Sequence, residues 1–313
     1  MLAAVATLLI TGGAGFIGSH LAEEALAHGD RVLVVDNLVT GRRENVPAGA
    51  VFLERDLADP GLEEILRDER VDVVSHHAAQ ANVRVSVDDP VHDVEANVVC
   101  GVKLIQACRR AGVRRILFAS SGGTVYGEQE RFPCDETHPT RPLSPYGCSK
   151  LAVEQFLGAY ARLGELEPVV LRYANVYGAR QYPAGEAGIV AILAEKFLSG
   201  EAPKIYGDGR QTRDYVHVSD LARVQRAVLG RWRAGTYNVG TGVETSLVEL
   251  YRLVAEGLGH RTEPEHVDAI SAELLRNSLD ASRLERTFGV RPQLPLAEGL
   301  AATLPSYREK VAR

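Results

Sequence analysis

Residues 11–18 read TGGAGFIG, and this glycine loop decides how the chain folds. The loop carries Gly12, Gly15 and Gly18, follows the apolar run VATLLI (5–10) directly, and opens a helical pattern. Glycines in such a strand-to-helix loop let the backbone turn tightly and approach a pyrophosphate, which then meets the free N–H groups of the helix. The spacing is GxxGxxG rather than GxGxxG, so the loop alone is also compatible with an ordinary strand-to-helix turn.

Acidic residues at the ends of the next two predicted strands extend this pattern. Asp36 ends RVLVVD (31–36), 18 residues after Gly18, where a carboxylate can hold the ribose hydroxyl groups of a dinucleotide. Asp56 ends VFLERD (51–56) in the same way. Taken alone, each aspartate could be a turn former at a strand end. Together with the glycine loop, the two residues predict dinucleotide binding.

Asp36 also favours one cofactor over another. A carboxylate at this position repels the 2′-phosphate of NADP, so the sequence predicts NAD as the cofactor. Arg42 and Arg43 lie close by in the sequence and could accommodate a 2′-phosphate, which leaves the choice between the two cofactors open at this point.

Short β-branched runs alternate with helical patterns along the first half of the chain. Several of these runs are apolar throughout, as strands covered by helices on both faces should be. This βαβ rhythm predicts an α/β fold with a Rossmann-type doubly wound parallel sheet and right-handed crossovers. The predicted strands are 5–10, 31–36, 51–56, 71–76, 114–120 and 167–172. The predicted helices are 16–28, 60–69, 92–111, 146–163, 188–199, 217–230, 246–258 and 296–311.

The pattern loosens after about residue 175, where Gly/Pro-rich loops appear. A chain of 313 residues also exceeds the usual size of a single hydrophobic core. We therefore expect a dinucleotide-binding domain over 1–175 and a smaller C-terminal α/β lobe over 176–313, with some later segments returning to the main sheet.

Composition excludes several classes of function. The net charge is −6 and no run of Lys or Arg is longer than two residues, so we expect no nucleic-acid partner and no anionic membrane surface as partner. No apolar stretch approaches the length of a membrane span. The start, MLAAVATLLI, lacks the positive charge of a signal peptide and reads as a first buried strand. Four cysteines match no zinc spacing, so we expect reduced thiols, a cytoplasmic location and no bound metal.

A second informative stretch is SPYGCSK (144–150). Pro142 and Pro145 suit a loop that enters a helix near Tyr146, and on that helix Lys150 shares a face with the tyrosine. Free tyrosine has a pKa of about 10, too high for a base at neutral pH, but a nearby ammonium and a positive nicotinamide favour the phenolate. The pair is therefore a candidate general base beside a hydride acceptor. The simpler alternative is a tyrosine at a helix start with a solvated lysine one turn away.

Several motifs, taken together, resemble one family. In order, they are TGGAGFIG (11–18), Asp36, HHAAQA (76–81), Asn97, SSGGTVYG (120–127), YGCSK (146–150), LRYANVYG (171–178) and TRDYVHV (212–218). Together they resemble the extended short-chain dehydrogenase/reductase family over nearly the whole chain, and within it the UDP-galactose (UDP-glucose) 4-epimerases most.

The resemblance implies how NAD is held. The glycine loop would meet the pyrophosphate, the end of the second strand the adenosine ribose, the end of the third strand the adenine, and the loop after the fourth strand the nicotinamide side. In that order the implied cofactor-binding residues are Gly12, Gly15, Phe16, Ile17, Gly18; Asp36, Asn37; Asp56, Leu57; and Ala78, Ala79, Gln80, with Asn97 nearby. An alternative for Asn97 is that it satisfies buried backbone groups. His76 and His77 are interpreted as packing residues, and His217 as a helix-start residue.

The resemblance also implies the catalytic and substrate-binding residues. Tyr146 would be the base, and Lys150 would bind the nicotinamide ribose and lower the pKa of the tyrosine. Asn175 and Arg213 would hold the diphosphate of a nucleotide sugar, and Tyr206 would lie by its base. Arg213 could instead be a surface cation paired with Asp214.

Two departures from the family pattern affect the sugar side. The family usually has Ser or Thr where this chain has Gly122, so Ser121 or Thr124 would have to bind the sugar 4-hydroxyl, and we favour Thr124. An alternative is that Thr124 is only a β-branched turn residue.

The second departure is ISAE (270–273), which stands where the family commonly has Arg-x-Gly-Asp. Ile270 replaces the arginine, and Glu273 is the acidic residue. Arg276 is a candidate to supply the lost charge to the diphosphate, although it could also be a solvated surface residue.

The resemblance implies NAD-dependent 4-epimerisation of a UDP-hexose, with transient hydride transfer to bound NAD⁺ and a 4-keto intermediate. Related enzymes include dehydratases and decarboxylases, but this chain has Gly123 and Thr124 where dehydratases place acidic residues. In the resemblance, the residue that gates bulk at the sugar 2-position falls near Asn277 or Ser278, and neither is bulky, so UDP-GlcNAc/UDP-GalNAc is an alternative substrate pair. A UDP-uronic acid is a further alternative. A non-catalytic NAD-binding sensor or scaffold is an alternative of another class. Pairing of the helices near 92–111 and 146–163 would give a homodimer.

Overall fold

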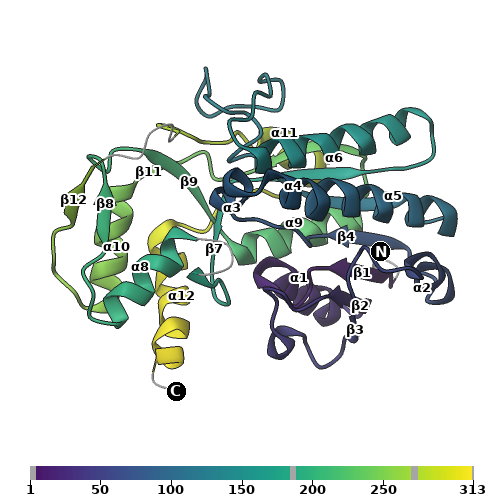
Figure 1. The fold of residues 1–313 in the computed structure, drawn as a ribbon, viewed down its shortest axis with the longest axis horizontal. Coiled ribbons are helices and arrows are strands. Elements are labelled where there is room, and N and C mark those ends of the chain that lie inside the picture. Colours follow the sequence, from purple (N-terminus) through teal and green to yellow (C-terminus); the bar gives the residue numbers. More distant parts are fainter. Residues whose placement is uncertain (1–4, 184–187, 269–273, 312–313) are drawn as a thin grey trace.

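The computed structural model describes residues 5–183, 188–268 and 274–311. Its larger lobe, on the right in Figure 1, is built on a parallel seven-stranded sheet in the order β10-β6-β5-β4-β1-β2-β3. The strands are β1 (Thr7–Thr11), β2 (Arg31–Asp36), β3 (Val51–Glu54), β4 (Val73–His76), β5 (Arg115–Ser121), β6 (Val169–Tyr173) and β10 (Gly235–Val239). This order confirms the predicted Rossmann-type doubly wound sheet. It reverses between β1 and β4, and ligands of such sheets bind where the order reverses, beyond the carboxyl ends of the strands.

Each face of the sheet has its own hydrophobic core, because successive strand residues point to opposite faces. On β1, Leu8 and Ile10 pack in one core and Leu9 in the other, and all three are fully buried. The first core is completed by α1 (Phe16–Ala27), α9 (Val218–Gly230) and α11 (Ser282–Phe288). The second is completed by α2 (Leu62–Asp68), α5 (Cys100–Ala111) and α6 (Pro145–Arg162).

The stretch predicted as one helix over 92–111 consists of two α-helices joined by a π-helical turn. It begins as α4 (Pro90–Val94), where the Asp89 side chain accepts a hydrogen bond from the His92 backbone. It then passes through a π-helical turn, Glu95–Val99, before it continues as α5. A short helix that was not predicted, α3 (Val83–Asp88), precedes it. π-Helical turns are often found at functional sites, and this one holds Asn97.

The smaller lobe, on the left in Figure 1, is centred on three helices. These are α8 (Ile189–Leu198), α10 (Leu247–Leu258) and α12 (Leu296–Val311), and they share one apolar core. Two small sheets flank them, one of β7 (Asn175–Tyr177), β9 (Thr212–His217) and β11 (Glu244–Ser246), the other of β8 (Lys204–Tyr206) and β12 (Glu265–Val267). β10, α9 and α11 belong to the larger lobe, in keeping with the expectation that some later segments return to the main sheet.

The predicted third strand is too long by two residues. β3 ends at Glu54, so Asp56 lies in the following loop rather than at the strand end. There the Asp56 side chain accepts a hydrogen bond from Ala58 N, and its backbone N–H donates to Asp59 Oδ2, which turns the chain away from the sheet. Among the described helices, none has the length and apolar character needed to cross a membrane. All four cysteines are free thiols, and the described residues contain no cluster of side chains suited to a metal ion.

Candidate active site

The glycine loop joins β1 to α1, and two of its glycines are required by close packing. Gly12 has φ +69°, and a Cβ atom there would lie 2.6 Å from the backbone nitrogen of Ala78. A Cβ at Gly18 would collide with the carbonyl oxygen of Gly12. Gly15 is different, because it begins α1 without a side-chain cap and a Cβ there would meet only the Gly12 oxygen, at 3.1 Å. The N-terminus of α1, at Phe16 and Ile17, is therefore open to an anion such as a pyrophosphate.

Asp36 lies at the end of β2, next to this loop. Its Oδ2 accepts a hydrogen bond from Ala14 N at 3.0 Å, and its Oδ1 accepts one from Leu38 N at 2.9 Å. Burial raises the pKa of the carboxyl group, and the two backbone bonds oppose that shift. A Cβ at Gly41 would come within 2.6 Å of Asp36 Oδ1, so glycine there leaves the carboxylate uncovered. A fixed carboxylate beside an open helix N-terminus fits the ribose and pyrophosphate of a dinucleotide.

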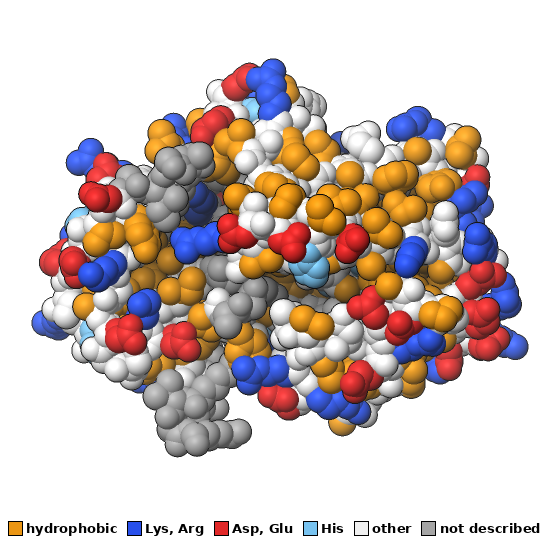
Figure 2. Space-filling view, in the orientation of Figure 1, with side chains coloured by type: hydrophobic (Ala, Val, Ile, Leu, Met, Phe, Trp, Pro, Cys, Tyr) orange, Lys and Arg blue, Asp and Glu red, His pale blue; other side chains and the backbone are white. Residues whose placement is uncertain are grey.

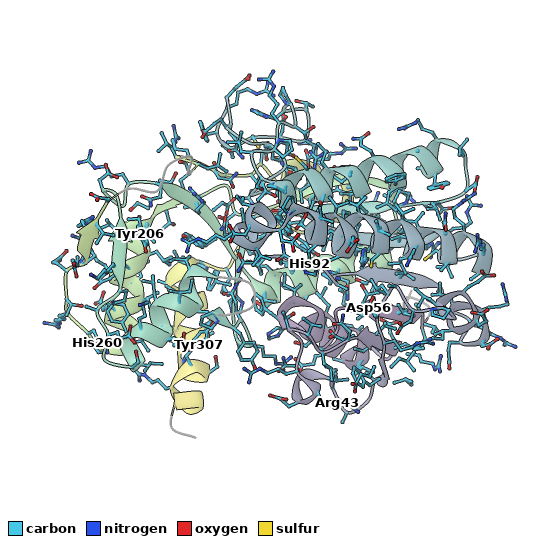
Figure 3. All side chains as sticks on the ribbon, viewed as in Figure 1. Arg43, Asp56, His92, Tyr206, His260 and Tyr307 are labelled. Atoms are coloured by element: carbon cyan, nitrogen blue, oxygen red, sulfur yellow. The ribbon has the colours of Figure 1, made fainter. Side chains whose placement is uncertain are left out.

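Two of the four residues predicted at the adenosine end are hydrogen-bonded to each other. Asn37 Nδ2 donates to Asp56 Oδ2 at 2.7 Å, which joins the loops that follow β2 and β3. Leu57 lies beside them and is buried. Figure 3 shows Asp56 in the larger lobe, far from Tyr206 on β8 in the smaller lobe.

The two arginines that left the choice of cofactor open are both stacked on aromatic rings. The guanidinium of Arg42 lies 3.7 Å from the ring centroid of Tyr182, and that of Arg43 lies 4.3 Å from the ring centroid of Phe52. Such stacking engages each cation with a ring face of its own. It therefore favours the interpretation that Asp36 selects NAD.

His76 ends β4 and His77 follows it, and the two histidines hold the next loop in place. Thr11 Oγ1 lies 2.7 Å from His76 Nδ1 and accepts hydrogen bonds from the backbone N–H groups of His77 and Ala78, both at 3.2 Å. His77 stacks on Tyr173, with Nε2 3.2 Å from the tyrosine hydroxyl. Burial lowers the pKa of both histidines to about 3, so both rings are neutral at neutral pH. These contacts agree with their interpretation as packing residues, and they set the path of Ala78, Ala79 and Gln80.

Tyr146 and Lys150 lie in the first turns of α6, as predicted. Ser144 caps the helix by accepting a hydrogen bond from Gly147 N, and Tyr146 N donates to Ser86 Oγ at 3.2 Å. Lys150 is buried, with Nζ 5.7 Å from the ring centroid of Tyr146. Burial lowers the pKa of Lys150 to about 8, while the negative charges of Asp93 and then Glu154 raise it. The lysine is therefore a buried cation on the same helix face as the tyrosine.

Asn97 is held in the π-helical turn by the loop after β4. Its Oδ1 accepts a hydrogen bond from Gln80 N at 3.1 Å, and its Nδ2 donates to Gln80 O at 3.0 Å. Asn97 thus satisfies buried backbone, as the alternative interpretation held, and a contact with the cofactor stays a prediction. The same Nδ2 donates to Asp93, a fully buried residue that the sequence reasoning missed. The only available signal was an aspartate four residues before Asn97, on the same face of a helix.

The residues predicted to contact the sugar, here called the sugar side, gather where β5 ends. A Cβ at Gly147 would lie 3.0 Å from the carbonyl oxygen of Thr124, so this threonine sits against the start of α6 near Tyr146. Its hydroxyl oxygen is buried and has no hydrogen-bond partner among the described residues, and the same is true of Asn175 Oδ1. Space remains around Gly123, where a Cβ would find Asn175 Oδ1 and Ser121 Oγ as its nearest contacts, both at 3.7 Å. Two unpaired polar atoms beside open space are typical of a ligand pocket.

The structure explains why residue 122 is glycine. A Cβ there would collide with the side chain of Leu279, which is fully buried. The backbone is also fixed, because Gly122 N donates to Tyr173 O at 2.8 Å and Gly122 O accepts from Asn277 Nδ2 at 3.2 Å. Serine or threonine at this position would therefore have to displace the buried Leu279 side chain. Both candidates for the sugar gate, Asn277 and Ser278, are buried next to the loop that carries Thr124.

The remaining predicted substrate residues come from the smaller lobe and its connections. Arg213 lies on β9, next to the fully buried Asp214, whose carboxylate accepts hydrogen bonds from three backbone N–H groups and the Thr241 hydroxyl. Arg276 donates two hydrogen bonds to Glu244, and its side chain is exposed to solvent. Ile270 and Glu273 lie outside the described residues. The roles expected for these side chains therefore stay predictions.

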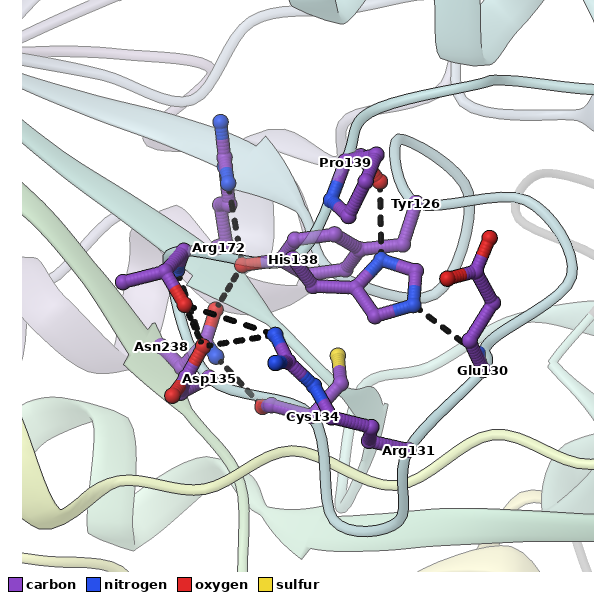
Figure 4. Close-up of polar contacts among 10 residues, drawn as sticks. Tyr126, Glu130, Arg131, Cys134, Asp135, His138, Pro139, Arg172 and Asn238 are labelled. Atoms are coloured by element: carbon purple, nitrogen blue, oxygen red, sulfur yellow. Dashed lines mark hydrogen bonds and ion pairs between the residues drawn. The ribbon is translucent and has the colours of Figure 1, made fainter.

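A second buried polar network, which no sequence motif indicated, lies beneath the site. Arg172 on β6 makes two hydrogen bonds to Glu154 of α6, and Ser120 on β5 also donates to Glu154. Figure 4 shows how the network continues from Arg172 to the Tyr126 hydroxyl, and from there to Asn238 on β10. We call these five residues the Arg172 network. It ties α6 to three strands of the sheet one turn beyond Lys150.

Comparison with known proteins identifies one family over most of the chain. Residues 8–240 match the NAD dependent epimerase/dehydratase family. A UDP-glucose 4-epimerase from Mycolicibacterium smegmatis is 43% identical over 308 residues, which cover 96% of this chain and 98% of the relative.

Two solved structures are also similar. One is a UDP-glucose 4-epimerase from Thermotoga maritima with UDP-glucose (TM-score 0.94, 39% identity, 97% of this chain and 99% of that chain covered). The other is a UDP-glucose 4-epimerase from Thermus thermophilus in complex with NAD (TM-score 0.90, 46% identity, 96% and 99% covered). From its glycine loop, its parallel sheet and these similarities, the chain belongs to the NAD dependent epimerase/dehydratase family.

Proposed function

We propose that this chain is an NAD-dependent 4-epimerase that interconverts UDP-galactose and UDP-glucose. The observation that carries the proposal is the geometry around α6. A buried lysine shares a helix face with Tyr146, and an unpaired buried hydroxyl, that of Thr124, lies at the start of the same helix. A base, a cation and an unsatisfied hydrogen-bonding group are what proton removal from a sugar hydroxyl requires.

NAD would be held along the carboxyl edge of the sheet. The N-terminus of α1 would bind the pyrophosphate, Asp36 and Asn37 the adenosine ribose, Asp56 and Leu57 the adenine, and Lys150 the nicotinamide ribose. The residues lining the nicotinamide side would be Ala78, Ala79, Gln80 and Asn97. When bound, NAD supplies the hydride acceptor and donor that the oxidation and reduction of C4 require.

Tyr146 takes the proton from the sugar 4-hydroxyl and later returns it. The Lys150 ammonium stabilises the phenolate form that acts as base. The Thr124 hydroxyl donates to or accepts from the same sugar oxygen and keeps it within reach of the tyrosine. The space beside Gly123 leaves room for the oxidised sugar to turn, which inversion at C4 requires.

The two lobes divide the work. Residues 1–175 mainly bind NAD, and residues 176–313 mainly bind the nucleotide sugar, through Asn175 at the boundary and through Arg213, Tyr206, Glu273 and Arg276. UDP-GlcNAc is a second candidate substrate, because Asn277 and Ser278, near the sugar 2-position in the resemblance, are not bulky; a UDP-uronic acid is a further alternative. Dehydration is disfavoured because Gly123 and Thr124 offer no carboxylate. A non-catalytic NAD-binding sensor would leave the Tyr146–Lys150 pair without a role.

We also infer a cytoplasmic homodimer. Figure 2 shows apolar side chains gathered over α4, α5 and α6, and the exposed ones include Val91, Val94, Val99, Leu143 and Phe156. An exposed apolar surface of this kind marks a protein interface, and a second copy of the chain would cover it by pairing these helices. Light scattering at micromolar concentration tests this inference, and a monomer would refute it.

Tyr146→Phe tests the function. The protein is incubated with UDP-galactose without added NAD, and the sugar is followed by proton NMR. Wild type should produce UDP-glucose, and the variant should lose at least about 1,000-fold in turnover, because general-base catalysis of this kind contributes up to about 10,000-fold. NAD binding should stay close to that of wild type.

The matched control is Tyr160→Phe, on the same helix but beside Arg109 and away from the site. It should keep full activity. Undiminished epimerisation by Tyr146→Phe would refute the mechanism, and no turnover of UDP-galactose by wild type would redirect the search to N-acetylated or uronic-acid sugars.

A further inference from the structure

Asp93 is a buried carboxylate at the meeting point of three elements of the site. It lies on α4 and is fully inaccessible to solvent. Its Oδ1 accepts hydrogen bonds from Gln80 Nε2 at 2.9 Å and from Asn97 Nδ2 at 3.0 Å, and its Oδ2 accepts one from Ser149 Oγ at 2.6 Å. It therefore links the loop after β4, the π-helical turn and α6.

The three donors to Asp93 are neutral, so they satisfy its hydrogen bonds without cancelling its charge. Glu154, the other carboxylate near Lys150, is different because Arg172 neutralises it through two hydrogen bonds. An isolated buried charge is costly unless a counter-ion lies close by. Ser149, which donates to Asp93, is directly followed in α6 by the buried cation Lys150, and the charge of Asp93 acts on this lysine.

We propose that Asp93 is the counter-ion of Lys150 and a positioning residue for the reaction. Its charge keeps the Lys150 ammonium protonated, and its bonds to Gln80, Asn97 and Ser149 keep that ammonium in register with the cofactor-lining loop. The positioning role rests on the proposed function, in which Lys150 stabilises the phenolate of Tyr146. The electrostatic pairing itself is argued from the burial of both groups, from the Asp93–Ser149 hydrogen bond beside Lys150, and from the charge of Asp93.

The direction of the pH effect follows from the charges around Lys150. On α6 these groups are Tyr146 and Glu154, on α4 Asp93, and beyond β4 His76 and His77, which burial keeps neutral. Asp93 contributes most to raising the pKa of Lys150, which burial has lowered to about 8. Removal of the Asp93 charge lowers the pKa of Lys150 further, so the ammonium group loses its proton at a lower pH. The alkaline limb of the kcat–pH profile therefore moves to lower pH.

The first test is the kcat–pH profile of Asp93→Asn with bound NAD and UDP-galactose. The alkaline limb should move down by about one pH unit or more, since an opposite charge at short range shifts a pKa by about 1–3 units. The loss of kcat should be larger at pH 8 than at pH 6, with KM little changed. Asp93→Glu, which keeps the charge, should restore the limb towards that of wild type.

The matched control is Asp220→Asn. Asp220 is also a buried carboxylate, but it lies on α9 and binds Arg223 and the backbone N–H groups of Gln293 and Leu294. Its replacement should lower the melting temperature and leave the pH profile in place. A uniform loss of kcat in Asp93→Asn with an unmoved limb would reduce Asp93 to a structural residue and overturn the proposal.

A second readout does not depend on activity. The chain has five lysines, few enough for the Lys150 side chain to be followed by NMR of protein labelled with ¹³C in lysine. Its titration midpoint should fall in Asp93→Asn and in Asp93→Ser, so a folding failure of one variant leaves the other. An unchanged midpoint in a folded variant would refute the pairing even if wild type proved inactive on UDP-galactose, and a lowered midpoint in inactive protein would refute only the proposed function.

Discussion

The cofactor side and the sugar side of the site differ in how their polar groups are satisfied. On the cofactor side, Asp36 is held by two backbone N–H groups, and Asn97 is held by Gln80 and Asp93. On the sugar side, the buried polar atoms of Thr124 and Asn175 have no hydrogen-bond partner among the described residues. A buried polar atom without a partner costs about 1–3 kcal/mol.

This difference indicates that the two sides are completed in different ways. The protein alone preorganises the cofactor side, so it can bind NAD and keep its shape through turnover. The sugar side is completed only when a ligand supplies the missing hydrogen bonds, so part of its binding free energy comes from satisfying those atoms. Substitutions on the cofactor side should therefore cost both structure and binding, whereas substitutions on the sugar side should cost activity alone.

Among the substitutions that test this difference, the largest effect is expected on the cofactor side, in Gly12→Ala. The new Cβ meets backbone atoms near Ala78 and the residue has φ +69°. We expect NAD affinity to fall by about 100-fold, because strain of roughly 3 kcal/mol is placed where the pyrophosphate binds. Isothermal titration with NAD measures the loss.

The control for this substitution is Gly29→Ala. Gly29 also has positive φ, +88°, but a Cβ there meets nothing within 4 Å. It should lose about 1–2 kcal/mol of stability from backbone strain alone and keep its NAD affinity. Equal NAD binding by the two variants would mean that the glycine loop is not the pyrophosphate site.

A smaller effect, confined to activity, is expected for Thr124→Val. Loss of the hydroxyl should lower kcat/KM by about 10- to 100-fold, in line with one hydrogen bond to a partly charged oxygen. Because that hydroxyl has no partner in the protein, the melting temperature should stay the same or rise. Ser121→Ala should change kcat/KM less, and the reverse ranking would assign the sugar contact to Ser121.

The smallest effect, a loss of stability, is expected for Gly122→Ser, at the boundary between the two sides. The added side chain meets Leu279, so we expect a loss of about 1–3 kcal/mol in stability from overpacking. In combination with Leu279→Ala the losses should not add, with a coupling of at least about 1 kcal/mol. Urea denaturation of the two single variants and the double variant gives the coupling.

The control for this cycle is Gly123→Ser. A Cβ at Gly123 has no neighbour closer than 3.7 Å, so this substitution should show no coupling to Leu279→Ala. Strict additivity in the Gly122→Ser cycle would mean that something other than Leu279 keeps serine out of position 122.

The sequence predicted the larger lobe well because local patterns determine it. The run RVLVVD was predicted as a strand over 31–36, and β2 has these bounds. Proline and serine around SPYGCSK signalled the start of α6, which begins at Pro145. In such segments, residues close together in the sequence determine both the burial of the strand and the start of the helix.

Other features depend on contacts between distant segments and could not be predicted. The π-helical turn, Glu95–Val99, has no periodic signal in the sequence, and the bonds of Asn97 to Gln80 join it to a loop 17 residues away. Asp93 lies near the start of the predicted helix 92–111, and no local pattern signals that it is buried against Ser149. The short strands of the smaller lobe, such as β8 and β12, have three residues each and carry no periodic pattern. Glu273 lies outside the described residues, so its role stays a prediction.

The contact between Gly122 and Leu279 also constrains how this chain can have diverged from relatives with serine or threonine at position 122. The two residues are 157 positions apart in the sequence, yet neither can change size independently. If serine or threonine replaces Gly122 before residue 279 becomes smaller, the intermediate protein is destabilised by overpacking. If residue 279 becomes smaller first, the intermediate protein contains a cavity. The two positions should therefore covary among homologues, with glycine at 122 accompanying a large side chain at 279.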